Sequence, residues 1–239
     1  MSRPPKMRYC AKCVYPALSV NNTLDDEGVC SACRMQEEFD TLTPEFWKQR
    51  EAKFIELAEE AKRKAQGNYD CIVPVSGGKD SYFQVHTVLE YGLKPLLVTY
   101  HGNNYLPEGQ GNLDRMRDVL KVDHLVFGPS IDTLIRLNRL CFRKMGDMNW
   151  HAHAGIKTYP MHIAAKFGIP LVVWGEITWT VSGMFSPNDY VEYNKRTVLE
   201  HDMRGFTWRD MIEDSEQLTE KDLVWLKMPS DEEIQKAAT

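Results

Sequence analysis

The chain has 239 residues, 43% of them hydrophobic, which is enough for one sizeable α/β domain and a small appendage. Its net charge of −5 argues against a dedicated nucleic-acid binder, because such proteins need a basic face. No apolar run approaches the length of a membrane span, and the N-terminal residues lack the apolar core of a signal peptide. We therefore expect a cytoplasmic protein with no membrane span and no nucleic-acid partner.

Four of the six cysteines form the pattern C-x2-C-x16-C-x2-C, at Cys10, Cys13, Cys30 and Cys33. In a cytosolic chain, two such pairs are typical of a tetrahedral zinc site rather than of disulfides. Four thiolates leave no open coordination position, so we expect the zinc to be structural. Cys71 and Cys141 stand alone and are expected to be packing residues.

A long helix is predicted next, opened by Thr43-Pro44-Glu45 and closed by Gly67-Asn68. From residue 69 the chain alternates apolar runs with helical periodicity, which predicts a parallel sheet with helices on both faces. The predicted strands are Cys71–Val75, Pro95–Tyr100, His124–Phe127 and Pro170–Trp174. The predicted helices between them are Lys79–Tyr91, Asn112–Leu120, Ile131–Met145 and Ile156–Phe167, and short helices follow at Thr207–Asp214, Glu220–Lys227 and Asp231–Ala238.

The most informative segment reads V-S-G-G-K-D-S, from Val75 to Ser81, and joins the first predicted strand to a helix. A Ser-Gly-Gly turn presents successive backbone N–H groups at the positive end of a helix, which favours an anion. Lys79 lies in the first helical turn, where a cation opposes the helix dipole unless an anion lies beside it. The common patterns G-x-x-x-x-G-K-[ST] and G-x-G-x-x-G are absent. The segment therefore predicts a phosphate-binding loop, with a nucleotide as its ligand.

This loop, placed after a buried strand, resembles that of the ATP pyrophosphatase (PP-loop) superfamily, whose domains are adenine nucleotide α-hydrolase-like. Members cleave ATP between the α- and β-phosphates and transfer AMP to a carbonyl oxygen. The resemblance implies ATP and Mg²⁺ as cofactors, with Lys79 as a mobile charge and Lys79 and Asp80 as catalytic residues. It implies a pyrophosphate site at Ser76, Gly77, Gly78, Lys79, Asp80 and Ser81, and an adenine site near Val75 and Tyr100, largely on backbone groups.

Four motifs follow one another between Cys10 and Gly109, within a resemblance that covers roughly residues 8–200: C-A-K-C-V-Y-P, D-D-E-G-V-C-S-A-C-R, V-P-V-S-G-G-K-D-S-Y-F-Q and L-L-V-T-Y-H-G-N-N-Y-L-P-E-G. Together they resemble the N-acetyl sugar amidotransferase family, which acts in surface polysaccharide, lipopolysaccharide O-antigen or flagellin sugar biosynthesis. That family converts the acetamido group of a nucleotide-activated sugar into an acetamidino group. The resemblance implies ammonia-supplying partners like the glutaminase and cyclase-type subunits of imidazole glycerol phosphate synthase.

These resemblances imply four parts. They are a zinc knuckle at 1–40, a connecting helix at 41–68, a PP-loop ATP pyrophosphatase domain at 69–200 and a helical extension at 201–239. On the substrate side, His101, Asn103 and Asn104 are expected to contact the sugar, and an Asn-rich turn that satisfies its own backbone is the alternative. Glu176 is expected to bind Mg²⁺ or orient ammonia, or else is a carboxylate at a helix start.

Two other functions stay open at this point. A PP-loop tRNA thiolase with an N-terminal zinc site is one, although such enzymes use further cysteines that this chain lacks. A zinc-containing scaffold with a regulatory nucleotide site is the other. Trp150, His151 and His153 precede a predicted helix and are either functional or ordinary surface groups.

Overall fold

The computed structural model describes residues 6–17, 22–65, 67–102, 104–175, 183, 185–188, 198–212 and 216–238. The chain divides into two compact units, each described here by itself. The first consists of Met1–Lys53 with Glu176–Glu192, and the second of Phe54–Gly175 with Tyr193–Thr239. Among the residues described, no helix combines the length and the apolar character needed to cross a membrane.

The first unit carries the two cysteine pairs on short antiparallel bridges, one between Tyr9 and Pro16 and one between Leu24 and Cys30. Helix α1 (Ser31–Asp40) begins directly after Cys30, whose sulfur accepts a hydrogen bond from the backbone N–H of Cys33. The sequence does not predict α1, because this helix buries only Ser31 and so has no apolar stripe. Helix α2 (Pro44–Lys64) begins where predicted and contains the boundary between the units.

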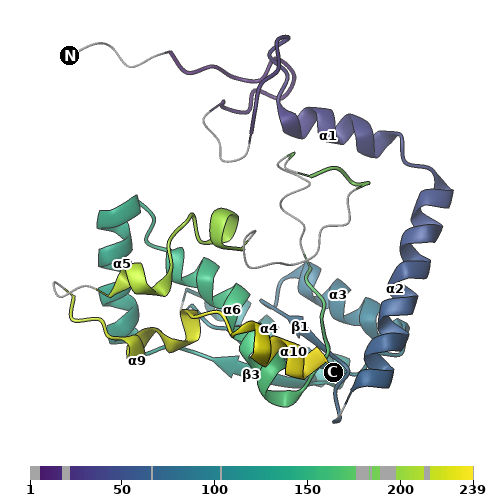
Figure 1. The fold of residues 1–239 in the computed structure, drawn as a ribbon, viewed down its shortest axis with the longest axis vertical. Helices are drawn as coiled ribbons and strands as arrows, with labels where there is room; N and C mark the ends of the chain where they lie inside the picture. Colours follow the sequence, from purple (N-terminus) through teal and green to yellow (C-terminus); the bar gives the residue numbers. More distant parts are fainter. Residues whose placement is uncertain are drawn as a thin grey trace. The chain divides into compact units, whose positions relative to one another are not determined.

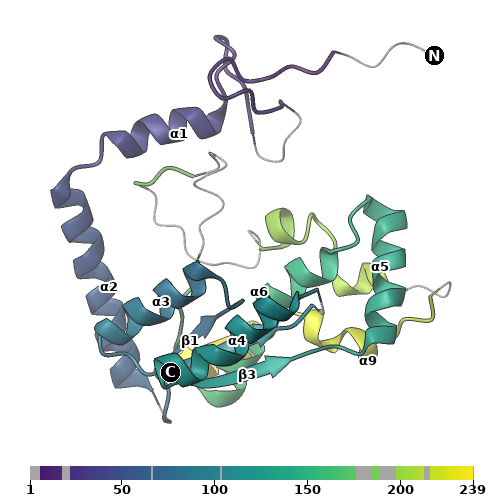
Figure 2. The same cartoon turned by 180° about the vertical axis from the view of Figure 1, so that it is seen from behind.

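The second unit is built on a four-stranded parallel sheet with the strand order β3-β2-β1-β4, and Figures 1 and 2 label its strands β1 and β3. The chain runs from β1 through β2 to the edge strand β3 and then returns to β4, on the other side of β1. The predicted parallel α/β fold is thereby confirmed. The strands are β1 (Cys71–Pro74), β2 (Pro95–Tyr100), β3 (Asp123–Phe127) and β4 (Leu171–Val172), and the helices between them are α3 (Lys79–Glu90), α4 (Pro107–Leu120), α5 (Ile131–Met145) and α6 (Trp150–Phe167).

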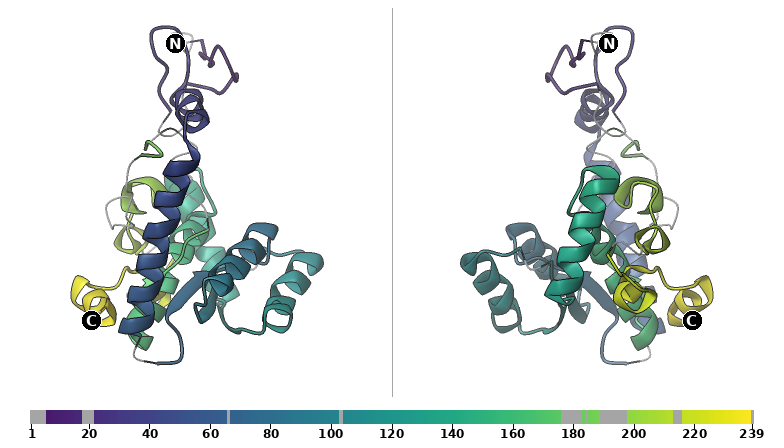
Figure 3. Two further views of the ribbon diagram at one scale, coloured as in Figure 1. Left: turned by 90° about the vertical axis from the view of Figure 1, so that its right-hand side faces the viewer. Right: turned by 90° about the vertical axis from the view of Figure 1, so that its left-hand side faces the viewer.

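Helices cover both faces of the sheet, because side chains along each strand alternate between them. On β2, Leu97 packs in the cluster that includes α3 and α4, while Leu96 and Val98 pack in the cluster that includes α5 and α6. Figure 3 shows the blue-teal helices α3 and α4 on one side of the strands and the green α6 on the other. The reversal of strand order between β2-β1 and β1-β4 places the topological switch point of the sheet beside β1.

Several element bounds differ from the prediction. Helix α4 begins at Pro107, five residues early, because the extended Leu106 and a proline in the first turn start it. Strand β4 spans only Leu171–Val172, although the backbone N–H of Val173 still donates to the oxygen of Ile72. The C-terminal part contains a π-helix at Val198–Asp202, 3-10 helices at Trp208–Met211 and Val224–Leu226, and the α-helices α9 (Glu220–Leu223) and α10 (Asp231–Ala238).

Helix α6 also begins early, at Trp150, and lies against β2 at a glycine. A Cβ atom on Gly155 would lie 2.4 Å from the ring of Tyr100, so only glycine admits this contact without displacement. Trp150 is fully buried, and its Nε1 donates to the backbone oxygen of Met203 over 2.9 Å. The start of α6 is therefore set by tertiary packing, which local periodicity does not report.

Gly155→Ala is expected to destabilise the fold by about 1–3 kcal/mol, because the ring of Tyr100 has to move. Gly111→Ala in α4 is the matched control, since no atom lies within 4 Å of its added Cβ and alanine favours a helix by roughly 0.5–1 kcal/mol. Urea unfolding measures both. Equal stability of the two variants would contradict the packing described for α6.

Candidate functional site

The V-S-G-G-K-D-S segment lies at the switch point, between the carboxyl end of β1 and the first turn of α3. Ligands of parallel α/β sheets bind at this edge, where strand order reverses. The backbone N–H of Ser76 donates to Oγ of Ser81 over 3.0 Å, and the two hydroxyl oxygens lie 3.3 Å apart. The loop thus closes on itself and brings two hydroxyls to the end of the helix.

Two glycines shape the loop for different reasons. Gly77 has a φ of +80°, and a Cβ there would lie 2.8 Å from the backbone nitrogen of Leu113 in α4. A side chain is therefore excluded by both conformation and contact. Gly78 is the N-cap of α3 and supplies no side-chain cap, so the first-turn N–H groups have no acceptor from that position. This arrangement suits an anion.

Lys79 and Asp80 form an ion pair at the start of α3, with Nζ 2.6 Å from Oδ1. Their side chains are 87% and 60% exposed, and exposed pairs contribute at most about 1 kcal/mol. Both groups can therefore exchange this contact for one with a bound ligand at little cost.

The two residues of the predicted adenine site, Val75 and Tyr100, lie in different environments. Val75 donates its N–H to the oxygen of Val98 over 3.0 Å, and its own oxygen accepts from Oγ1 of Thr99 over 2.6 Å. The side chain of Tyr100 is buried on the face that α6 covers, opposite α3. Contact of Val75 and Tyr100 with adenine stays a prediction.

Of the predicted sugar-contacting residues, His101 is held by α4. Its Nε2 lies 2.7 Å from Oε1 of Gln110, and its ring stacks on Tyr105 with centroids 4.6 Å apart. Asn104 is exposed nearby. Asn103 and the predicted catalytic residue Glu176 lie outside the described residues, so their contacts stay predictions.

The histidines before the predicted fourth helix lie inside α6. His151 is buried, with Nδ1 3.4 Å from the hydroxyl oxygen of Tyr100, and this burial lowers its pKa to about 4. It is therefore neutral at ordinary pH and has a packing role. His153 is exposed. Cys141 is buried with Sγ 3.7 Å from Sδ of Met211, which fits its predicted packing role.

A partly buried ion pair between Lys157 of α6 and Asp202 could not be predicted from the sequence. Nζ of Lys157 lies 3.8 Å from Oδ2 of Asp202 and 4.7 Å from the ring centre of Trp174, just beyond β4. Burial raises the pKa of Asp202, and the charge of Lys157 opposes that rise. The partners come from distant parts of the chain, so no local pattern could have indicated them.

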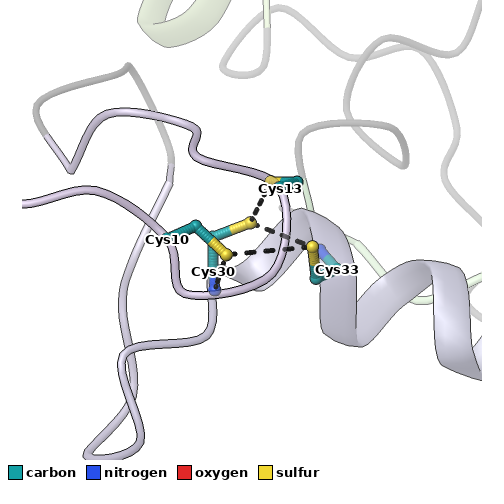
Figure 4. A group of neighbouring side chains, drawn as sticks. All are labelled: Cys10, Cys13, Cys30 and Cys33. Carbon is teal, nitrogen blue, oxygen red and sulfur yellow. Dashed lines mark hydrogen bonds between the residues drawn. The ribbon is translucent and has the colours of Figure 1, made fainter.

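The four predicted zinc ligands come together in the first unit, and Figure 4 shows their sulfur atoms converging. The sulfurs of Cys10 and Cys33 are 3.9 Å apart, those of Cys13 and Cys30 are 3.6 Å apart, and all four lie within 4.8 Å of one another. Tetrahedral zinc with bonds of about 2.3 Å sets its sulfurs roughly 3.8 Å apart. The cluster therefore fits a zinc ion.

Backbone N–H groups near the cluster also stabilise negative charge on a cysteine sulfur. The N–H groups of Lys12 and Cys30 each donate to the sulfur of Cys10 over 3.3 Å. Oδ1 of Asp25 accepts a hydrogen bond from the N–H of Val29 over 2.8 Å, which stabilises the turn between the two cysteine pairs. This hydrogen bond and the nearby Arg34 lower the pKa of the Asp25 carboxyl. A metal with four thiolates would leave no position for a substrate, so the structural role of this site stays a prediction.

No protein-family model matches the sequence, and no curated protein matches it. Among solved structures, the chain is similar to NMN synthetase from Francisella tularensis, with a TM-score of 0.44 and 13% sequence identity. The match covers 82% of this chain and 92% of that one. A likeness of this extent carries no functional conclusion.

Cys30→Ser is expected to abolish stoichiometric zinc binding, because three thiolates and a hydroxyl hold the metal far more weakly. Cys141→Ala is the control, since that buried cysteine lies in the other unit. Zinc content measured by mass spectrometry of the purified proteins checks this. Full zinc content in Cys30→Ser would contradict the site.

Because burial lowers the pKa of His151, we expect the free energy of unfolding to depend on pH. Its pKa is about 4 in the folded chain and near 6.5 when unfolded, so protons bind the unfolded state first as pH falls. Stability is complete above pH 6.5 and declines toward pH 4, by up to about 3 kcal/mol from this group. His151→Gln should flatten that decline relative to wild type in urea unfolding between pH 7.5 and 5. Parallel profiles would contradict it.

Proposed function

We propose that the chain is an ATP-dependent enzyme that forms AMP and pyrophosphate. The observation that carries this proposal is the loop at the switch point, where Gly77 admits no side chain, Gly78 leaves the helix N-terminus uncapped, and the hydroxyls of Ser76 and Ser81 converge. A helix N-terminus with flanking hydroxyls and a lysine suits a pyrophosphate group. Such chemistry needs positioning and charge stabilisation more than covalent help.

In this proposal the loop holds the β- and γ-phosphates of ATP. Backbone N–H groups of the first turn of α3 and the two serine hydroxyls donate to the phosphate oxygens. Lys79 leaves Asp80 and stabilises the charge that develops on the departing pyrophosphate. Mg²⁺ bound with ATP supplies further positive charge at the phosphates, and the exposed carboxylate of Asp80 is available to it.

The acceptor proposed is the acetamido group of a nucleotide-activated sugar. Its amide oxygen attacks the α-phosphorus, the bond to the β-phosphate bridge breaks, and pyrophosphate leaves with the electron pair. Ammonia then attacks the resulting imidate carbon and expels AMP, which leaves an acetamidino group. An amide oxygen is a weak nucleophile, so the two substrates must be held in near-attack geometry. The ordered motifs in residues 8–200 and the position of His101 beside the carboxyl edge of β2 support this acceptor.

Ammonia is mostly protonated at neutral pH, so we propose a partner that supplies it, such as a glutaminase with a cyclase-type subunit. Outside the cluster of four cysteines, neither remaining thiol is suited to glutaminase chemistry. Cys71 and Cys141 are buried, and burial raises the pKa of Cys141 to about 12. The same burial weighs against the tRNA thiolase alternative, which needs accessible sulfur-handling cysteines.

The test is pyrophosphate release from ATP with Mg²⁺, an ammonium salt and a panel of nucleotide-linked diacetamido sugars. We expect release that depends on the sugar. Ser81→Ala and Lys79→Ala should lower turnover at least a hundredfold, because each removes a donor to the leaving group. Lys94→Ala, an exposed lysine beside the amino end of β2, is the matched control and should retain activity.

Zinc content should be unchanged in all three variants, since the loop and the cysteines belong to different units. Thiolation of tRNA without sugar-dependent pyrophosphate release would show that the acceptor is tRNA and not a sugar. Full activity of Ser81→Ala would contradict the proposed role of the loop in catalysis.

A further inference from the structure

A second cavity opens at the carboxyl ends of β2 and β3, between α5 and the C-terminal helices of the same unit. Its volume is ≈ 210 Å³, and its walls come from Tyr100, Phe127, residues 129–137 at the start of α5, and residues 221, 222, 225 and 226. Apart from Tyr100, which is also predicted to lie near the adenine, none of these residues has a part in the loop chemistry described above. The volume is below the roughly 300 Å³ at which pockets for whole small ligands begin, so the cavity takes part of a ligand.

One wall of the cavity is aromatic. The rings of Phe127 and Trp225 have centroids 4.9 Å apart, and those of Tyr100 and Phe127 are 6.0 Å apart. Phe127 and Trp225 are only partly buried and line the cavity, while the ring of Phe127 also stacks on Tyr159 with centroids 5.0 Å apart. Such surfaces favour planar rings such as nucleobases, whose stacking on aromatic side chains contributes about 1–3 kcal/mol per base.

Another wall carries the hydroxyl groups of Ser130 and Thr133. Thr133 is 7% exposed, and its hydroxyl makes no hydrogen bond within the described part of the chain. Ser130 is the N-cap of the fifteen-residue helix α5, yet its side chain makes no capping bond. Ser130 is exposed and Thr133 lines the cavity, so both hydroxyls are accessible to a ligand with acceptor atoms.

Charge at the same wall favours an anion. Lys221 lines the cavity and forms no ion pair among the residues that the structure describes. Its neighbour Asp222 is occupied elsewhere, because Oδ2 accepts from the backbone N–H and hydroxyl of Thr219 and Oδ1 lies 3.9 Å from Nη2 of Arg136. The lysine therefore adds to the positive end of α5 beside Ser130 and Thr133.

We propose that this cavity binds the nucleoside diphosphate part of the acceptor, with the base against Phe127 and Trp225 and the phosphates toward Ser130, Thr133 and Lys221. This inference rests on the proposed function. Strands β1 and β3 lie two strand spacings apart, about 10 Å, and end at the same edge of the sheet. A ligand held at β3 by its diphosphate can therefore extend its sugar toward the loop at β1.

The experiment measures binding of UDP, CDP, GDP and dTDP to the full chain by calorimetry, without ATP. We expect at least one to bind. Thr133→Val keeps the shape of the buried side chain and removes only the hydroxyl, and Lys221→Ala removes the charge. Each should weaken that binding about tenfold or more. Lys94→Ala removes the same charge at the opposite edge of the sheet and should bind as wild type does.

Inorganic pyrophosphate is the second probe and should bind at least tenfold more weakly than the preferred nucleoside diphosphate, because it lacks the stacked base. Equal binding of the two probes would overturn the role of the aromatic wall. Absence of binding by all four nucleotides, or unchanged binding in both Thr133→Val and Lys221→Ala, would overturn the site.

The turnover assay separates this inference from the proposed function. If wild type releases pyrophosphate in a sugar-dependent way while Lys221→Ala keeps the acceptor KM, the cavity assignment fails and the proposed function stands. If no sugar supports turnover but Lys221→Ala still loses nucleotide binding, the proposed function fails and the cavity assignment stands. A raised acceptor KM with an unchanged KM for ATP supports both.

Discussion

The second unit depends on one close approach, between the backbone of Gly77 and that of Leu113. Because a Cβ at Gly77 would lie 2.8 Å from the nitrogen of Leu113, the loop after β1 and the middle of α4 can meet only through glycine. That approach sets the direction in which the chain enters α3 and keeps the uncapped end of the helix at the switch point of the sheet. The proposed chemistry follows from this placement, since an anion there meets N–H groups, hydroxyls and a lysine together.

The two units place different demands on the sequence. The first buries little apolar surface of its own around Cys10, Val29 and Cys30, so the predicted metal would contribute much of its stability. The second has a continuous core on each face of the sheet, with fully buried residues such as Ile72 and Leu97. Small units without a large core commonly use a metal in its place. A structural purpose for the cysteine cluster, independent of the loop, stays a prediction.

Elements with strong local patterns could be predicted to the residue. Pro95–Tyr100 and Ile131–Met145 are such elements, because an apolar run and a continuous helical stripe define them. The cysteine cluster was equally predictable from spacing alone. The start of α6 was not, because tertiary contacts of Trp150 and Gly155 set it. Nor was the second cavity, whose walls combine residue 100 with residues 127–137 and 221–226, and no local pattern encodes such a combination.

The alternation of side chains along β2 has an evolutionary consequence. Leu97 belongs to the core on the side of α3 and α4, whereas Tyr100 belongs to the core on the side of α5 and α6, where the second cavity lies. Substitutions in α5 or in residues 221–226 therefore leave the layer of α3 and α4 intact. Under the proposed function, a lineage can change the ligand of the cavity by substitutions on one side of the sheet, while the proposed activating chemistry at the loop after β1 stays unchanged.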